Sequence, residues 1–169
     1  MIKILPLEED TGISEPFYQL VVTIGYGEHC DDTYTQNCLE INDEKAVQYN
    51  NLTEEEIEEM DLLEFMDLAK YITTEDAERI VKLIKSILGR KTSGGHVVGH
   101  IVLNDGPDDF WWKECCEMTD EEFKSMEDVC EKYENSLFSP KVDHNWYGIT
   151  NAQIVYYDEN NNKHRCEVI

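Results

Sequence analysis

Basic side chains are scarce in this sequence of 169 residues, which has 14 lysines and arginines against 37 aspartates and glutamates. The formal net charge at pH 7 is therefore −23. Proteins that bind nucleic acids hold the phosphates with clustered lysines and arginines, so this composition argues against direct binding of nucleic acid. The same charge disfavours contact with an anionic membrane surface.

Long apolar runs are absent as well. The most apolar windows, residues 20–24 and 97–103, are far shorter than the ~20 residues that a membrane-spanning helix needs. The apolar stretch before Glu8 is too short for the core of a signal peptide. We therefore expect a cytoplasmic protein that has no membrane partner.

Cysteines are present without a spacing that indicates a metal site. The six are Cys30, Cys38, Cys115, Cys116, Cys130 and Cys166. Because the chain shows no secretion signal, we expect them to be free thiols in a reducing compartment. The gap between Cys30 and Cys38 matches no standard zinc motif, even with His29 beside Cys30. The sequence therefore predicts neither a metal site nor a cofactor.

Catalytic and phosphate-binding motifs are also missing. His96 and His100 lie in the segment HVVGH, which is typical of a strand, where four residues span ~13 Å. Their rings would then lie on one face of the sheet but too far apart to bind one metal ion. The segment 89–95, GRKTSGG, lacks the order of a phosphate-binding loop. We identify no catalytic residue.

Residues 158–162, DENNN, resemble part of a calcium-binding loop. Asp158, Asn160 and Asn162 stand at its first, third and fifth positions, but Lys163 replaces the required glycine. A hairpin turn explains the same residues and fits the apolar segments on either side.

Apolar and aromatic residues are frequent enough for one folded core. The chain is 41% hydrophobic and has three Trp, nine Tyr and five Phe. Residues 17–26 are rich in β-branched and aromatic side chains and predict a strand, and a shorter strand at 36–41 could pair with it as a hairpin. Residues 96–103 predict a buried central strand, and residues 149–157 and 163–169 predict a C-terminal hairpin.

Helices are predicted between these strands. Thr53 with Glu56 forms a capping-box pattern, and a break near residue 60 separates a short helix from a second one. The second helix would turn five apolar side chains inward: Leu62, Phe65, Met66, Ala69 and Ile72. A third helix follows Thr74 and ends at Gly89, a short one follows Asp108, and another follows Thr119.

The alternation of these elements predicts an α+β fold. We expect a single domain spanning residues 1–169, in which a mostly antiparallel sheet packs with four to five helices. The N-terminal hairpin, the C-terminal hairpin and the central strand would make up the sheet.

Acidic residues are segregated along the chain. Residues 1–68 have 18 acids and two bases, residues 69–104 have three acids and six bases, and residues 105–134 have twelve acids and three bases. Solubility alone does not require this segregation. The candidate partner-binding residues are Glu54, Glu55, Glu56, Glu58, Glu59, Asp61, Glu64, Asp108, Asp109, Asp120, Glu121 and Glu122.

Carboxylates carried on helices can present negative charge at a density close to that of nucleic-acid phosphates. In charge, size and lack of a catalytic motif, the chain resembles the DNA-mimic inhibitors of phages and mobile elements, which include anti-restriction and anti-CRISPR proteins. This resemblance implies an inhibitor that binds a basic nucleic-acid-binding protein, such as a nuclease, by protein–protein interaction. If the protein is phage-encoded, it would act in the host-cell cytoplasm.

Two other functions fit the sequence. One is an intracellular enzyme whose site is assembled from residues distant in the chain, with Cys30, His96, His100, His144 and nearby carboxylates as candidates. The other is an immunity-type module that binds a basic protein unrelated to nucleic acid.

Overall fold

The computed structural model describes residues 15–103, 113–143 and 145–169. They form one mixed sheet with the strand order β3-β2-β1-β5-β4, and β6 also pairs with β5. The long strands, which pair antiparallel, are β1 (Phe17–Tyr26), β2 (Thr33–Ile41) and β5 (Tyr147–Tyr157). The short strands are β3 (Tyr71–Ile72), which runs parallel to β2, β4 (Ile101–Val102) and β6 (Lys163–Cys166).

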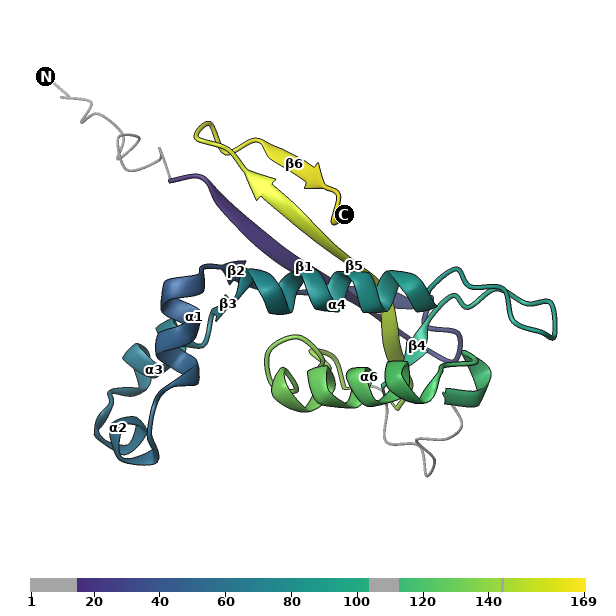
Figure 1. The fold of residues 1–169 in the computed structure, drawn as a ribbon, viewed down its shortest axis with the longest axis horizontal. Coiled ribbons are helices and arrows are strands. Elements are labelled where there is room, and N and C mark those ends of the chain that lie inside the picture. Colours follow the sequence, from purple (N-terminus) through teal and green to yellow (C-terminus); the bar gives the residue numbers. More distant parts are fainter. Residues whose placement is uncertain (1–14, 104–112, 144) are drawn as a thin grey trace, which may run out of the picture.

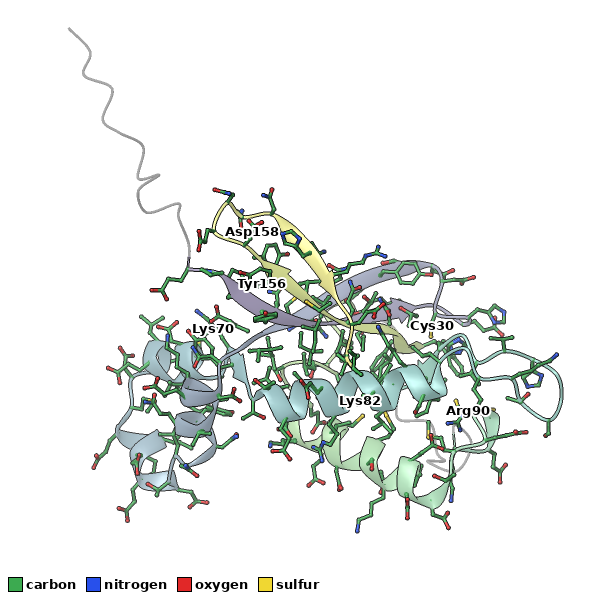
Figure 2. The ribbon with its side chains drawn as sticks, turned by 45° about the horizontal axis from the view of Figure 1, so that its top comes forward. Cys30, Lys70, Lys82, Arg90, Tyr156 and Asp158 are labelled. Atoms are coloured by element: carbon green, nitrogen blue, oxygen red, sulfur yellow. The ribbon has the colours of Figure 1, made fainter. Side chains whose placement is uncertain are left out.

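The core lies between this sheet and two amphipathic helices, α4 (Thr74–Ile87) and α6 (Asp120–Lys132). Both helices cover the same face of the sheet (Figure 2). Alternate residues of β1 point toward them, and Leu20, Val22 and Ile24 are fully buried. Burial of these apolar side chains provides the main driving force for folding.

Three short helices lie at one end of the molecule, away from this core (Figure 1). They are α1 (Asp43–Asn50), α2 (Glu54–Glu59) and α3 (Leu62–Leu68). The rings of Tyr49 and Phe65, whose centroids are 5.7 Å apart, join α1 to α3. Helices α2 and α3 have no buried residue, and α1 has only Ala46. We call residues 43–68 the acidic lobe.

The acidic lobe is attached to the core at its first helix. The Asp43 carboxylate accepts hydrogen bonds from the backbone N–H of Thr74, at 2.8 Å, and from its hydroxyl, at 2.7 Å. Thr74 begins α4, so this carboxylate connects the start of α1 to the positive end of the α4 dipole.

The α+β fold predicted from the sequence is confirmed. The strand predicted at residues 17–26 coincides with β1, and the predicted hairpins are formed by β1 with β2 and by β5 with β6. The break near residue 60 separates α2 from α3, because Met60 and Asp61 have extended backbone conformations. The segment 158–162 is a hairpin turn in which the Asp158 carboxylate accepts backbone hydrogen bonds from Asn160 and Asn162.

The prediction of a central strand at residues 96–103 is wrong. Only Ile101 and Val102 form a strand, β4, and it lies at an edge of the sheet. The preceding residues pair with their own loop instead. The Val98 N–H donates a hydrogen bond to the Arg90 carbonyl, and Lys91 and Val97 form an isolated antiparallel β-bridge. The backbone groups of this segment are therefore already bonded and cannot extend the sheet.

The inward orientation predicted for the second helix is wrong for two of its five residues, Leu62 and Met66, whereas Ile72 is buried and Phe65 and Ala69 are half-buried. Leu62 is 69% exposed and Met66 is 53% exposed. The helix ends at Leu68, and Ile72 belongs to β3. The Lys70 carbonyl accepts a hydrogen bond from the N–H of Glu40 in β2, and the Ile72 carbonyl accepts one from Asn42, the residue after β2. Phe65 of α3 packs against Tyr49 of α1, but Leu62 and Met66 lie outside that contact and remain exposed.

The sequence did not predict α1, and the helix expected after Asp108 lies largely outside the described residues. Over the described part of the chain, every helix is too short or too polar to cross a membrane.

Candidate acidic interface

Seven of the predicted partner-binding residues gather on α2 and the start of α3. Each of the two helices is capped at its N-terminus. The Thr53 hydroxyl caps α2 by accepting a hydrogen bond from the Glu56 N–H. The Asp61 carboxylate caps α3 by accepting one from the Leu63 N–H. Acidic side chains in the first turn are favourable because the helix dipole is positive there. The seven residues, all exposed, are Glu54, Glu55, Glu56, Glu58, Glu59, Asp61 and Glu64.

These carboxylates lack ionic partners: over the described residues, none of the seven is part of a salt bridge. The nearest basic side chain along the chain, Lys70, pairs with Asp67 at 2.8 Å. The acidic lobe contains ten acids and one base, Lys45, whose ammonium donates a hydrogen bond to the Tyr71 hydroxyl. The lobe therefore presents a net charge of −9 to solvent.

The acids at the start of α6 are in a different environment. The Arg90 guanidinium makes two hydrogen bonds to the Glu122 carboxylate, of 3.1 and 2.5 Å. These bonds from Arg90 lower the pKa of Glu122 to about 2. The Lys113 ammonium lies 2.5 Å from Asp120 and lowers the pKa of that carboxyl as well. Of the three predicted residues there, two have an ionic partner within the fold, and Glu121 is exposed.

The two acidic clusters do not form one surface. The C-terminal end of α6 borders the acidic lobe, because Lys132 and Tyr133 line a cavity of about 250 Å³ together with Tyr49 and Phe65. The 13 residues of α6 extend for about 20 Å, so its N-terminal acids lie at the far end from the lobe (Figure 1). Asp108 and Asp109 lie outside the described residues.

The residues that the sequence analysis missed are apolar side chains exposed among these acids. Leu62 and Leu63 are each 69% exposed, Met66 is 53% exposed, Val47 is 48% exposed and Ile57 is 40% exposed. The apolar spacing of Leu62 and Met66 is typical of a core helix, and only the position of α3 beyond the sheet shows that these side chains are exposed. Single exposed apolar residues are common, whereas a contiguous group such as Leu62, Leu63 and Met66 on α3 is typical of an interaction site.

The residues named for an alternative enzyme site lie in different environments, although His100 is close to His29 and Asp31, the neighbours of Cys30 in the chain. Burial, with a smaller contribution from Asp31, raises the pKa of the Cys30 thiol to about 11, so it is protonated at neutral pH. His96 is exposed in the loop between Lys91 and Val97, and His144 lies outside the described residues. Burial, and to a lesser degree the nearby His29, lowers the pKa of His100.

No metal centre is formed by the residues that the structure describes, which include no group of three or more His, Cys, Asp or Glu placed to bind an ion. All six cysteines are free thiols. Comparison with family models, with curated proteins and with solved structures finds no match to this chain.

Proposed function

We propose that this protein is an acidic inhibitor that mimics the charge of a nucleic acid and occupies the basic groove of a nucleic-acid-binding enzyme, as anti-restriction and anti-CRISPR proteins do. The observation that supports the proposal is the row of exposed carboxylates on the acidic lobe that have no ionic partner among the described residues. The partner would be a protein, such as a nuclease, and the contact would be protein–protein.

The density of charge on α2 supports mimicry of a phosphate backbone. Its six residues carry five carboxylates over a helix about 9 Å long, or about one charge per 1.8 Å. Duplex DNA carries one negative charge per ~1.7 Å of its axis. A groove that attracts DNA would therefore be attracted to α2 with a similar field and at a rate that falls with salt.

The lack of internal neutralisation is the second argument. A carboxylate that has an ionic partner within its own fold, such as Glu122 with Arg90, offers little charge to another protein. The lobe carboxylates repel one another, and a row of lysines and arginines on a partner would relieve that repulsion.

The test is a pull-down of the tagged protein from a lysate of the cells in which it acts, at ~0.1 M and ~0.5 M salt, with and without nuclease. We expect one basic nucleic-acid-binding protein to be retained at low salt and to be displaced by added DNA or RNA. The purified partner should then lose activity when the protein is added. Retention that persists at ~0.5 M salt, or that free nucleic acid does not reduce, would contradict the proposal.

Two variants with the same change of charge identify the surface. The first carries E55Q, E58Q, E59Q and D61N, in which asparagine keeps the cap of α3. The second carries E75Q, E127Q, D128N and E131Q, which are exposed acids outside the lobe. The first variant should lose binding and the second should keep it. Equal loss in both would mean that total charge matters and that the lobe is not the contact.

A further inference from the structure

We propose that the outer face of α3, formed by Leu62, Leu63 and Met66, is a docking site for a basic amphipathic helix of the partner protein. This inference rests on the proposed function, and it adds that the contact has an apolar centre within the acidic surface. It is drawn from the exposure of these three side chains, from their position on the helix and from the charges beside them.

The three side chains share one face of α3. At about 100° per residue, Leu62, Met66 and Leu63 fall within an arc of about 100°. Phe65, which packs against Tyr49, lies about 110° around the helix from the middle of this arc, and the partly buried Leu68 lies on the opposite side. The outer face is thus not the face that attaches α3 to the rest of the lobe.

Acidic side chains border this apolar face. Glu64 and Asp67 follow Leu63 around the helix, and Asp61 stands at its N-terminus. Helix α2 adds five more carboxylates just before it, and residues 53–69 contain no basic residue. A ligand that fills this surface must bring apolar side chains on one face and positive charge beside them.

A basic amphipathic helix satisfies both requirements, since it presents an apolar stripe flanked by lysines or arginines. A second copy of this chain does not, because two lobes of net charge −9 would be brought together. An anionic membrane surface is excluded by the same repulsion. Charge complementarity therefore selects one kind of partner for this face.

The experiment uses two synthetic peptides of 18 residues made of leucine and lysine. One places its leucines on a single helical face, and the other has the same composition in a scrambled order. Binding to the full-length protein is measured by fluorescence anisotropy at ~0.1 M salt, and helix formation by circular dichroism. We expect the amphipathic peptide to bind at least about tenfold more tightly than the scrambled one and to become helical.

The protein variants separate apolar docking from charge. A variant with L62S, L63S and M66S should weaken binding of the amphipathic peptide by at least about tenfold and leave the scrambled peptide unaffected. A control with V97S, V142S and I169S, which are exposed apolar residues elsewhere, should bind as the original protein does. Because the six side chains are exposed, both variants are expected to fold.

Two results would overturn the inference. Equal binding of the two peptides to the original protein would show that charge alone selects the ligand, and the proposed function would remain intact. Sedimentation experiments could show dimers that form with rising concentration and that disappear in the L62S, L63S and M66S variant. That result would assign the face to a second copy of the chain. Failure of the proposed function is seen separately, as the absence of a salt-sensitive basic partner in the pull-down.

Discussion

Asp76 on α4 accepts a hydrogen bond from the hydroxyl of Tyr133, the residue that ends α6. The same carboxylate accepts from the Lys132 ammonium at 2.6 Å and lies 3.4 Å from the Arg79 guanidinium. Asp76 is only 9% exposed, so these contacts compensate a charge that is largely removed from water. They connect the two helices that cover the sheet, next to the cavity beside the acidic lobe.

Removing this carboxylate should destabilise the fold. D76A leaves the Tyr133 hydroxyl without its acceptor and removes the polar contact between α4 and α6, and we expect a loss of about 3 kcal/mol in the free energy of unfolding. The measurement is urea denaturation followed by tryptophan fluorescence. The matched control is D67A, which removes an exposed ion pair with Lys70 and should change stability by less than about 0.5 kcal/mol. Similar losses in both variants would contradict the role assigned to Asp76.

The Arg90–Glu122 pair should make stability depend on pH in the acid range. Hydrogen bonds from Arg90 hold the pKa of Glu122 at about 2, below its ordinary value of 4.5. A group whose pKa is lowered by folding stabilises the protein above its unfolded pKa, and the stabilisation is lost as the pH falls through the folded value. The contribution should therefore be complete at pH 7 and disappear between about pH 5 and pH 2.

The variant that isolates this charge is E122Q, since glutamine keeps the capping box with Thr119. Because the pair is partly open to solvent, we expect E122Q to be less stable by about 1 to 2 kcal/mol at pH 7. The difference between the two proteins should shrink to near zero at pH 2. A difference that stays constant across this range would mean that the ion pair does not cause it.

Much of the fold was predictable from local patterns. The alternation in β1 places Leu20, Val22 and Ile24 on one face, and the 3.6-residue spacing of Ile80, Ile84 and Ile87 places them on one face of α4. Both patterns coincide with the side chains that are fully buried. Where one element buries its whole apolar face against another, the sequence period is sufficient to predict the contact.

The candidate site was only partly predictable, because its decisive features depend on tertiary position. The charge pattern of the sequence finds the acids of α2, but it groups Glu122 with them although its partner Arg90 lies 32 residues away. Leu62 and Met66 were expected inside the core, and no local pattern records that α3 lies beyond the sheet. The partner of a charge and the exposure of a helix face are properties of the assembled chain.

Repulsion within the acidic lobe should make the protein more stable in salt. Salt screens like charges, so we expect the melting temperature to rise by about 3 °C or more between ~0.02 M and ~0.5 M sodium chloride. The variant with E55Q, E58Q, E59Q and D61N should start from a higher melting temperature at low salt and show a smaller rise. The variant with E75Q, E127Q, D128N and E131Q provides the comparison. A fall in melting temperature with salt would indicate that ion pairs outweigh repulsion.

The six thiols should react at rates that separate the proposed inhibitor from the alternative enzyme. Burial is the largest cause that raises the pKa values of Cys30 and Cys116 to about 11 and of Cys130 to about 12, and only the thiolate attacks a disulfide reagent. Cys38 and Cys115 are exposed. We expect these two to react first with an aromatic disulfide reagent at pH 8. Cys30, Cys116 and Cys130, whose pKa values are strongly raised, should react only after unfolding.

Mass spectrometry after a short exposure to iodoacetamide identifies which thiols have reacted. The matched controls are C38S and C115S, which should remove the fast phase of the reaction with the disulfide reagent. A nucleophile poised for catalysis would instead have a lowered pKa and react fast in the folded state. Cys30 could instead be labelled faster than the other thiols in the native protein and lose this advantage in 6 M guanidinium chloride. That result would contradict the burial of its sulfur. That result would favour the alternative function, an enzyme whose site includes Cys30 and His100.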